Sequence, residues 1–517
     1  MNATLFIALF LSAILPLLAQ TSAAVSFDWE DYYEIVSIPS PEGVDTQVGG
    51  LTFMENGEIA ACFHRGEVML YNPESKTWRP FAKGLHEPLG IYLEDEGTLL
   101  VVQRAELTRL HDKDGDGLAD FYEVVCNDWG LSGNYHEFTF GLVKDSQKNI
   151  YLSLGTASSG SGVRAEIRGS WNAAGGLAQD DFLYGGEHGP WNRKKKGIAR
   201  MYARVPYRGC VLKIEPNSLK AQVYATGFRT PNGLYMDKSD QLWVSDNQGD
   251  WVGASKLHRV QSGGFHGHPA SLLWGENPPT VIPAELPVEQ LEERRVKSAA
   301  LMPQGECANS LTQIISCRPE FGVSSKEDSN HLLIGDMNHS RLVRYLPDVV
   351  NGRYQGAVVH LLAAGSLGMG NNRLVYAPNN KSLYVGKTHL SWPGREGLNQ
   401  ITYTGKPFLQ AESLMLTSTG FEFEFNSELS IPSEKSAYKI QSYRIAYHAE
   451  YGSKNFDQEE EPCAEVYARG KKLIIELDKA LKPDRVYDIQ LPAEIRSELS
   501  SISSTRFWYT AHEVHSR

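Results

Sequence analysis

Short apolar strands alternate with polar turns along most of the chain. Five segments share one form, in which an apolar strand and a polar turn precede an alternating strand of L-x-V or I-x-L type. These segments start at Gly49, Glu87, Phe140, Thr230 and Asn371, and a sixth, shorter pair lies near Asn330. Alternation with a period of two is typical of half-buried β-strands. Strand pairs that recur at intervals of tens of residues indicate the blades of a propeller.

The repeat therefore predicts an all-β fold, whose main part is a six-bladed β-propeller over residues 25–410. Each pair would supply the inner strands of one four-stranded blade, and the intervening segments would complete it. Two long inserts follow the third and fourth units, and we expect a short helix in the Pro-, Glu- and Arg-rich second insert. Long connections of this kind usually carry function or cover a face of the fold.

The pattern changes after about residue 410. The segments "TGFEFEFNSEL", "KLIIELDKAL" and "VYDIQLP" alternate as strands do, but they are not arranged in blade-like pairs. We predict that residues 411–517 form a separate β-sandwich of immunoglobulin-like type. Nothing in this part of the sequence indicates catalysis.

The N-terminal segment predicts export. Residues 1–24 are an apolar run that ends in small residues, which is the pattern of a signal peptide cleaved near Ala24. The run contains no Lys or Arg, so an uncleaved N-terminal anchor is the alternative. No second apolar stretch follows, and we expect a periplasmic or secreted protein with no stable membrane span.

Composition narrows the range of partners. The 517 residues include 50 Lys and Arg against 62 Asp and Glu, which gives a net charge of −12. A negative balance argues against nucleic acid or an anionic membrane surface as a general partner. It suits divalent cations and neutral or cationic substrates.

Six cysteines are scattered through the chain. An exported compartment permits disulfides, and Cys307 and Cys317 are close enough in sequence to close a loop. Free thiols are the alternative. There is no C-x-x-C-H motif, so the chain carries no covalent haem.

The most specific local motif is "DKDGDGLADFYE", which runs from Asp112 to Glu123. Hard oxygen ligands at alternate positions, a glycine at the sharp turn and a closing carboxylate match an EF-type calcium loop. The predicted ligands are Asp112, Asp114, Asp116, the carbonyl of Leu118, Asp120 and Glu123. The strand that precedes the loop excludes an EF-hand helix pair. A solvated acidic turn is the alternative, and a bound calcium ion would mainly stiffen the loop.

Polar residues recur just before the inner strands of the blades, where side chains of a propeller face the central channel. His136 precedes the third unit and Arg229 the fourth, whereas Arg373 precedes the last, whose second strand ends near Lys387. Because these positions are equivalent, we expect the side chains to converge, and the cations among them suit an anionic ligand. A structural histidine and ion pairs between blades are the alternatives.

The stretch "VSDNQGDWVGASKLHRVQSGGFHGHP", from Val244 to Pro269, resembles a second cation site. Asn247 and Asp250 offer oxygen ligands, and Gly249 allows a turn that exposes backbone carbonyls. His266 and His268 alternate near its end, but two histidines without a third ligand are a weak zinc signal.

The stretch and the segment before it also carry a family resemblance. The residues "GFRTPNGLYMDKSDQLWVSDNQGDWVGASKLHRVQSGGFHGHP" resemble the R-N-P-x-G-L … L-W-V-S-E-x-G-P … G-G-N-Y-G-W-P block of quinoprotein glucose/sorbosone dehydrogenases. The segments "RAELTRLHDKDGDGLADFYE", "YHEFTFGLV" and "NNRLVYAPNNKSLYVGKT" are similar to a subgroup of large exported proteins from planctomycete- and verrucomicrobia-type bacteria. The resemblance covers nearly the whole mature chain.

This resemblance implies a six-bladed propeller that binds pyrroloquinoline quinone (PQQ) and calcium at one face. It implies that His136 is the general base and that Arg229 pairs with the carboxylates of the cofactor, while the backbone of Gly249 and Asp250 holds calcium. Asn247, in the same stretch, and Arg373 and Lys387, at equivalent places in the repeat, are the other cofactor contacts that we expect. The chain departs from the family pattern at Thr230, where the family has Asn, and at Asp250, where it has Pro. Many subgroup members carry a haem domain that this chain lacks, so electrons would pass to a separate cytochrome or quinone.

Three functional hypotheses follow from the sequence. The first is oxidation of a sugar or polyol with PQQ and calcium. The second is a calcium-dependent lactonase or related hydrolase, whose metal site Asp246, Asn247, Asp336 and Asn338 could supply. The third is a propeller that binds carbohydrate or protein without catalysis, because fold alone does not determine function.

Overall fold

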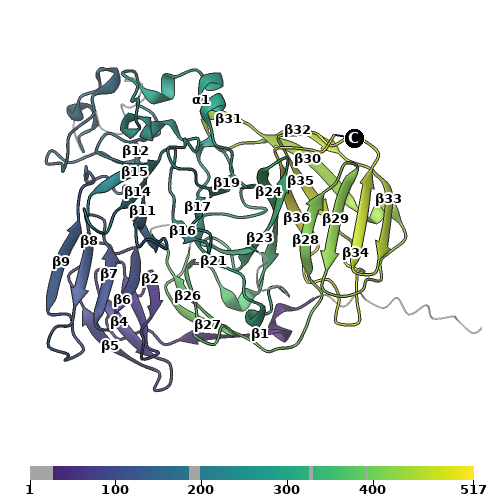
Figure 1. Cartoon of the computed structure of the whole chain (residues 1–517), viewed down its shortest axis with the longest axis horizontal. Coiled ribbons are helices and arrows are strands. Elements are labelled where there is room, and N and C mark those ends of the chain that lie inside the picture. Colours follow the sequence, from purple (N-terminus) through teal and green to yellow (C-terminus); the bar gives the residue numbers. More distant parts are fainter. Residues whose placement is uncertain (1–26, 185–197, 325–329, 391–393, 517) are drawn as a thin grey trace, which may run out of the picture.

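The computed structural model describes residues 27–184, 198–324, 330–390 and 394–516, and antiparallel β-sheet makes up almost all of its regular structure (Figure 1). The predicted all-β class is confirmed. The α-helix among these residues, α1 (Val288–Arg294), lies in the second long insert, where a short helix was expected. The N-terminal segment predicted as a signal peptide lies outside the described residues. Among the described residues, no helix is long and apolar enough to cross a membrane.

Six groups of four antiparallel strands follow one another along the chain. The first three groups are β2 (Val48–Phe53), β3 (Ile59–Phe63), β4 (Val68–Asn72) and β5 (Thr77–Ala82); β6 (Gly90–Asp95), β7 (Thr98–Val102), β8 (Leu107–His111) and β9 (Phe121–Cys126); and β10 (Thr139–Lys144), β11 (Ile150–Leu154), β14 (Val211–Ile214) and β15 (Ala221–Ala225). A short pair, β12 (Ala157–Ser158) and β13 (Met201–Tyr202), lies in the insert of the third group.

The other three groups complete the set. They are β16 (Gly233–Met236), β17 (Leu242–Asp246), β19 (Ser255–Arg259) and β20 (Ala300–Met302); β21 (Leu311–Ser316), β22 (Leu332–Asp336), β23 (Leu342–Val350) and β24 (Arg353–Leu361); and β25 (Asn371–Tyr376), β26 (Ser382–Lys387), β27 (Gly397–Tyr403) and β1 (Tyr33–Ile38).

The first strands of the six groups form a closed ring. Strands β2, β6, β10, β16, β21 and β25 each contact the next in this order, and β25 contacts β2. The sixth group is completed by β1 from the other end of the chain, with Tyr33 opposite Tyr403 and Ile38 opposite Leu398. The ring therefore closes by antiparallel pairing of strands that lie more than 350 residues apart.

Five of the six predicted strand pairs are the first and second strands of a group. The pair predicted near Asn330 is instead the second and third strands, β22 and β23, and sequence analysis missed the first strand, β21. The reason is the connection between β21 and β22, which runs from Cys317 to His331 and breaks the short strand–turn–strand pattern used to find the other pairs.

Two further sheets follow the ring. One consists of β28 (Ala411–Leu416), β29 (Gly420–Phe425), β34 (Lys472–Leu477) and β33 (Cys463–Arg469). The other consists of β36 (Arg506–Ala511), β35 (Arg485–Gln490), β30 (Lys439–Ile445) and β32 (Asn455–Glu460), and it continues the sheet of β24. Their facing apolar side chains, among them Phe421, Phe423 and Phe507, form one buried core.

The C-terminal sheets are joined to the ring at two places. Strand β36 pairs with β24, with Trp508 opposite Val358, and the two strands run side by side in Figure 1. Strand β31 (Tyr447–Tyr451) reaches over to pair with β18 (Asp250–Val252). The second joint lies within the stretch that the sequence singled out, so the C-terminal part helps to shape that stretch.

The predicted disulfide between Cys307 and Cys317 does not form, and the cysteines among the described residues are free thiols. Cys307 precedes β21 and Cys317 follows it. An extended strand of this length separates its ends by about 20 Å, whereas the Cα atoms of a disulfide lie within about 7 Å of each other. Closeness in sequence was therefore misleading, because the intervening residues form an extended strand.

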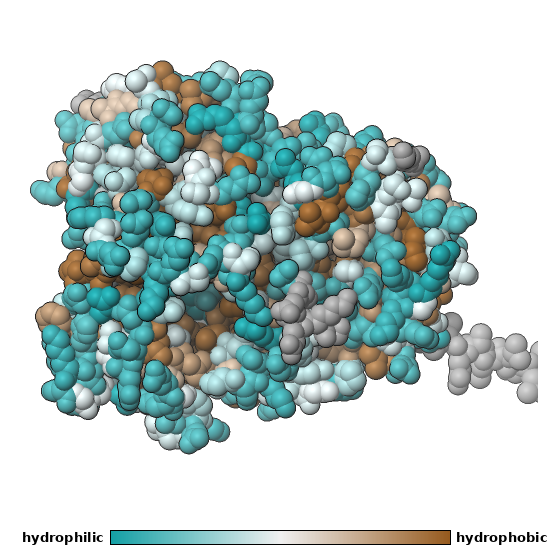
Figure 2. Space-filling model, in the orientation of Figure 1, coloured by the Kyte–Doolittle hydropathy of each residue, from teal (hydrophilic) through white to brown (hydrophobic). Residues whose placement is uncertain are grey.

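The surface of the molecule is mostly hydrophilic (Figure 2). In the view of Figure 2 hydrophilic side chains cover most of the molecule, and apolar side chains occur in small, separate groups. Scattered apolar residues of this kind are normal on a folded protein.

Candidate functional site

The candidate site lies at the end of the ring where the third and fourth groups begin. His136 precedes β10 and is buried, with 4% of its surface exposed. Its Nδ1 lies 2.8 Å from the carbonyl oxygen of Thr156. A carbonyl can only accept a hydrogen bond, so Nδ1 carries the proton and Nε2 keeps its lone pair. Burial, followed by the charge of Arg229, lowers the pKa of His136 to about 3, so the ring is neutral at ordinary pH.

Glu137, next in the chain, does not orient the histidine ring. Its carboxylate accepts hydrogen bonds from the backbone N–H of Ser132, at 2.8 Å, and from the Ser132 hydroxyl, at 2.7 Å. The backbone N–H of His136 donates to Oδ1 of Asn134. These contacts fix the loop before β10 and hold the histidine in place through its backbone.

Arg229, Asp250 and His268 form a connected chain of polar contacts beside His136. Arg229 Nε lies 3.3 Å from Asp250 Oδ1, and His268 Nε2 lies 3.2 Å from Asp250 Oδ2. The Ala270 N–H donates to His268 Nδ1, so Nε2 is the nitrogen that donates to Asp250. Burial raises the pKa of Asp250, but His268 and Arg229 outweigh that effect and hold it below its ordinary value. The carboxylate is therefore ionised and offsets the charge of Arg229.

Asp246 holds the backbone from which Arg229 projects. Its carboxylate accepts from the N–H of Thr230 at 2.6 Å and from the N–H of Arg229 at 3.0 Å. Lys256, buried on β19, places Nζ 3.4 Å from the same carboxylate and 2.7 Å from the backbone oxygen of Asn247. Sequence analysis missed Lys256 and the role of His268, because their partners lie on neighbouring strands that the local pattern does not reveal.

Asn247 has an unusual side chain. Its Oδ1 is buried and has no hydrogen-bond partner among the described residues. A buried carbonyl oxygen without a donor costs free energy, which makes such an atom a candidate ligand for a cation or a bound molecule.

Gly249 is required by the packing of Arg229. A Cβ atom at this position would lie 2.1 Å from Arg229 Nε and 2.4 Å from its Cδ. The backbone oxygen of Gly249 accepts a hydrogen bond of 2.9 Å from the N–H of Gly452, which follows β31. The predicted cation-binding turn is therefore packed on one side by Arg229 and on the other by the C-terminal part of the chain.

Tyr451, at the end of β31, adds an aromatic ring to the site. Gln248 Nε2 donates to its hydroxyl at 2.6 Å, and the guanidinium groups of Arg200 and Arg229 lie 4.0 and 5.6 Å from the ring centroid. The side chain is 45% exposed. No sequence pattern indicated this contribution, because it depends on strand pairing across about 200 residues.

Arg373 and Lys387 do not join this cluster. Arg373 lies inside the ring, where it donates to the backbone oxygens of Gly49 and Leu89 and to Asn232, and burial lowers its pKa to about 10. It lines a small internal cavity of about 40 Å³.

Lys387 is bound in a similar way at the end of β26. Its Nζ donates to the backbone oxygen of Leu367 and to Asn371 Oδ1, and burial lowers its pKa to about 7. The expected convergence of three cations is therefore not observed among the described residues, since Arg229 alone of the three contacts Asp250.

The carboxylates predicted for a hydrolase metal site are occupied by protein donors. Asp336 accepts from Arg341 Nε at 2.9 Å and contacts His339 Nδ1 at 3.1 Å, and Asp246 is engaged as described above. Asp246 ends β17 and Asp336 ends β22, the second strands of the fourth and fifth groups, and no hydrogen-bonding group among the described residues is shared by the two carboxylates.

The predicted calcium loop connects β8 to β9 on the outer side of the second group. Oxygen atoms of Asp112, Asp114 and Asp116 lie within 4.8 Å of one another, and these three are the only such cluster of His, Cys, Asp or Glu among the described residues. Asp112 accepts from the N–H groups of Gly115 and Gly117, so the backbone turns around the carboxylate.

Glu123 lies apart from this cluster. It is on β9, where Arg109 Nη1 and His111 Nε2 each lie 3.0 Å from its Oε2 and lower its pKa, His111 more than Arg109. Asp120 is closer to the loop, and its Oδ2 accepts from the N–H groups of Lys113 and Asp114. The strand register therefore directs Glu123 toward its sheet neighbours.

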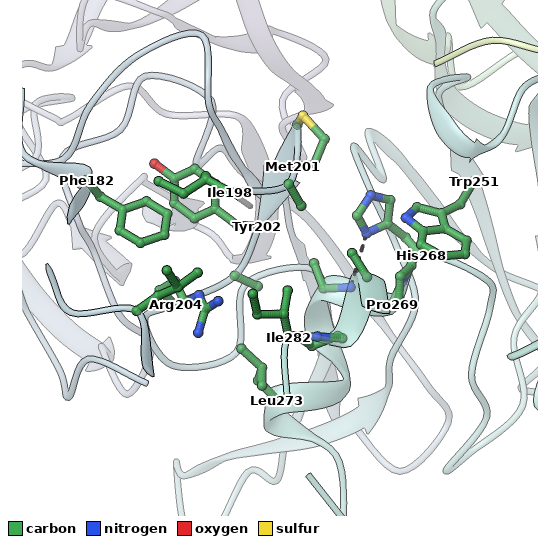
Figure 3. A pocket seen from close by; sticks show the side chains of 16 residues that line it. Phe182, Ile198, Met201, Tyr202, Arg204, Trp251, His268, Pro269, Leu273 and Ile282 are labelled. Carbon is green, nitrogen blue, oxygen red and sulfur yellow. Dashed lines mark hydrogen bonds between the residues drawn. The ribbon is translucent and has the colours of Figure 1, made fainter. Parts of the chain in front are cut away.

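The two long inserts pack together next to Asp250 and His268. Figure 3 shows Phe182, Tyr202 and Arg204 on one side of a cavity and Trp251 and His268 on the other. The cavity measures about 20 Å³, which is room for about one water molecule. The inserts thus form a packed wall, and Met201 in that wall lies 3.8 Å from Arg229 Nη2 through its sulfur.

Comparisons with known proteins do not name a family. No family model matches the chain, and no curated protein matches it. Solved structures give remote likenesses, which include the PQQ-bound form of an aldose sugar dehydrogenase from Streptomyces coelicolor, with 12% identity, coverage of 72% of this chain and 98% of that chain, and a TM-score of 0.44.

Two others illustrate the range of activities. The holo form of the pyranose dehydrogenase PQQ domain from Coprinopsis cinerea has 10% identity, coverage of 72% and 95%, and a TM-score of 0.47. A luciferin-regenerating enzyme has 9% identity, coverage of 72% and 96%, and a TM-score of 0.43. At such values the function of this chain must be argued from its own residues.

The packing of Arg229 against Gly249 gives a first prediction. Gly249→Ala should displace the arginine side chain and lower the midpoint of thermal unfolding by about 1–3 °C, because the new methyl group overlaps atoms of a buried side chain that Asp250 holds in place. Gly365→Ala is the matched control, since a Cβ there meets nothing within 4 Å. Equal midpoints for the two variants, measured by circular dichroism, would contradict the packing described here.

Proposed function

We propose that this chain is an exported oxidoreductase that oxidises a hydroxyl or aldehyde group of a sugar or polyol, with calcium-bound PQQ as the hydride acceptor. We identify the six groups of strands as the blades of a propeller over residues 25–410, and residues 411–517 as an immunoglobulin-like β-sandwich. Residues 1–24 are the proposed signal peptide, and a separate cytochrome or quinone is the proposed acceptor of the electrons.

The state of His136 is the observation that carries the proposal. Because Nδ1 donates to Thr156 and the pKa is about 3, Nε2 holds a free lone pair over the whole physiological range of pH. Because a pKa of about 3 makes this imidazole a weak base, it would accept the proton of the substrate hydroxyl as the hydride leaves, when the oxygen has become strongly acidic. The rigid loop around Glu137 and Asn134 would keep that nitrogen in one position during the reaction.

The donor set at the site is compatible with calcium and PQQ. The unpartnered Oδ1 of Asn247 and the backbone oxygen of Asp250 are hard ligands of the kind that calcium prefers, and the backbone oxygen of Gly249 keeps a second lone pair beside the hydrogen bond that it accepts from Gly452. Arg229 would bind a carboxylate of the cofactor. Among the described residues its Nη2 donates a hydrogen bond only to the sulfur of Met201, so this N–H group is the one that would turn to the cofactor most easily. Such a cofactor would supply the two-electron acceptor that the protein side chains lack.

Asp250 opposes the binding of an anionic cofactor. Its carboxylate already pairs with Arg229, and it stands where the family pattern has a proline that carries no charge. The aromatic ring of Tyr451 and the exposed Arg200 beside it could compensate in part. We propose that Arg373 and Lys387, which are bound to backbone oxygens, act on the cofactor only by holding the ring and the loop before β25.

The proposal predicts quinone-dependent turnover that requires His136. The protein incubated with PQQ and calcium should reduce a redox dye in the presence of sugars or polyols. His136→Gln should lower the rate by about 10²- to 10⁴-fold without changing quinone affinity, because the variant lacks only the proton acceptor. The rate should show no titration of His136 between about pH 5 and pH 8, since protonation near pH 3 is what removes the lone pair.

His515→Gln, an exposed histidine near the C-terminus, is the control and should leave the rate unchanged. Full turnover of His136→Gln would refute the mechanism. Failure to bind PQQ at all, followed by hydrolysis of a lactone or by sugar binding without turnover, would favour the hydrolase or the non-catalytic alternative.

A second experiment concerns the charge of Asp250. Asp250→Asn keeps the backbone oxygen and removes the negative charge beside Arg229, so we expect PQQ to bind about fivefold to tenfold more tightly, measured by fluorescence quenching. Weaker binding in the variant would mean that the carboxylate itself holds the metal ion.

The proposal also predicts that the loop between β8 and β9 binds calcium through its three clustered carboxylates. Asp114→Asn should weaken calcium binding measured by isothermal titration calorimetry at least tenfold, because it removes a charged ligand from the cluster. Glu123→Gln should change the affinity little, since that carboxylate is engaged by Arg109 and His111. Equal losses in both variants would restore Glu123 as a ligand.

A further inference from the structure

A second and much larger cavity lies at the other end of the ring from His136. It has a volume of about 510 Å³ and lies between the fourth and fifth groups of strands and the C-terminal sheets. Arg229, in the candidate site, precedes β16, whereas Asp237, which lines the cavity, follows this strand. The site and the cavity therefore lie at opposite ends of β16. Its size is within the range of small-molecule binding sites, and neither His136 nor any neighbour of it lines the cavity.

Aromatic side chains form much of the cavity wall. Trp243 and Tyr354 have ring centroids 6.1 Å apart, and Tyr235 lines the same space. Tyr354 is 37% exposed, and Met415 of β28 is 39% exposed at the same cavity. Trp243 is buried behind Tyr354, so the ring of Tyr354 is the exposed aromatic surface, and such a ring stacks against the C–H face of a pyranose ring or against a planar ligand.

The acidic side chains of the cavity are already saturated by protein donors. Asp237 accepts from the N–H groups of Ser239 and Gln241 and from Trp243 Nε1 at 3.0 Å. Asp348 accepts from the N–H of Leu416 and from the hydroxyl of Tyr509. Burial raises the pKa of Asp237, but its hydrogen bonds to Ser239 and Trp243 outweigh this and keep the carboxyl below its ordinary value.

Two arginine side chains that line the cavity have no carboxylate partner among the described residues. Arg259 lies over the ring of Tyr354, 4.3 Å from its centroid, and forms no ion pair with the described residues. The Nε of Arg318 is buried and has no hydrogen-bond partner among those residues. Arginine donors in this state are suited to the planar, bidentate binding of a carboxylate or sulfate.

The cavity shares two wall residues with a neighbouring one. Arg259 and Tyr354 also line a hollow of about 260 Å³, together with Gln261, Lys297 and Arg353. The two hollows lie on either side of these shared residues and together offer room for more than one pyranose ring. Lys297 and Arg353 have partners in Asp484 and Glu513, which leaves Arg259 and Arg318 as the main anion-binding groups.

We propose that the seam between the fourth and fifth groups of strands and the C-terminal sheets binds an acidic oligosaccharide, with a pyranose ring on Tyr354 and carboxylate or sulfate groups on Arg259 and Arg318. Single-stranded nucleic acid also uses aromatic rings and cations. The net charge of −12 opposes the long-range attraction on which nucleic-acid binding relies, and the seam has two unpaired guanidinium groups rather than a continuous basic track. The proposal does not depend on oxidoreductase activity, because the two sites share no residue.

The test uses the full chain and titration calorimetry with trigalacturonate, a trimer of pyranose rings that carry carboxylates. We expect trigalacturonate to bind the unmodified chain. Arg318→Gln and Arg259→Gln should each weaken this binding at least tenfold. Maltotriose, the neutral trimer, should bind the unmodified chain at least tenfold more weakly than trigalacturonate. Arg469→Gln is the matched control, because Arg469 lies over Tyr467 at 4.8 Å on β33, away from the seam. The thermal midpoint of each variant identifies any that fail to fold.

Tyr354→Ala is a second test, in which no charge is removed. The variant should bind trigalacturonate about tenfold more weakly, because it loses the ring that stacks on the sugar and that holds Arg259 in position. The proposal is overturned if trigalacturonate does not bind, if maltotriose binds equally well, or if Arg469→Gln loses as much affinity as Arg318→Gln. Tighter binding of an oligothymidylate of four nucleotides would assign the seam to nucleic acid instead.

Discussion

Closure of the ring is the constraint on which the rest of the structure depends. Each four-stranded sheet buries its faces against its two neighbours, so an open ring would expose apolar faces at both ends. Pairing of β1 with β27 removes those ends, and an aromatic cluster of Trp29, Tyr33 and Phe408 packs beside the joint. From inside the ring, Arg373 adds hydrogen bonds to the backbone of β2, at Gly49, and of Leu89, the residue before β6. The candidate site exists only because closure brings the loops before β10 and β16 to the same end.

The C-terminal sheets act on that site as well as on the fold. Through β24 and β36 they extend one sheet of the ring, and through β31 they pair with the strand that carries Asp250. The N–H of Gly452 and the ring of Tyr451 then contact the turn at Gly249 and the side chain of Arg229. A sandwich that sequence analysis regarded as unconnected with chemistry is therefore part of the wall of the candidate site.

Local pattern predicted the features that depend on a few consecutive residues. Alternation located five strand pairs, and acidic residues at alternate positions located a turn whose carboxylates do gather. Local pattern did not predict contacts between residues that are far apart in the sequence. The strand β21 lacks a close neighbour in sequence, and Glu123 is directed by strand register. Lys256 and Tyr451 acquire their roles from pairing between strands, and His268 from a side-chain contact with Asp250 on another element. The position of His136 was predictable, whereas its anchoring by Thr156 was not.

The distribution of charge separates the two ends of the ring. At the end with His136, three cations have partners among the described residues: Arg229 pairs with Asp250, Lys256 with Asp246, and Lys387 with backbone oxygens. Burial and the charge of Arg229 keep the histidine neutral, and Asp250 acts in the opposite direction. At the opposite end the carboxylates accept hydrogen bonds from their own neighbours, so the guanidinium groups of Arg259 and Arg318 keep their charge for a ligand. An acidic protein can thus present an anion-binding seam, because local hydrogen bonding rather than net charge decides which groups remain available.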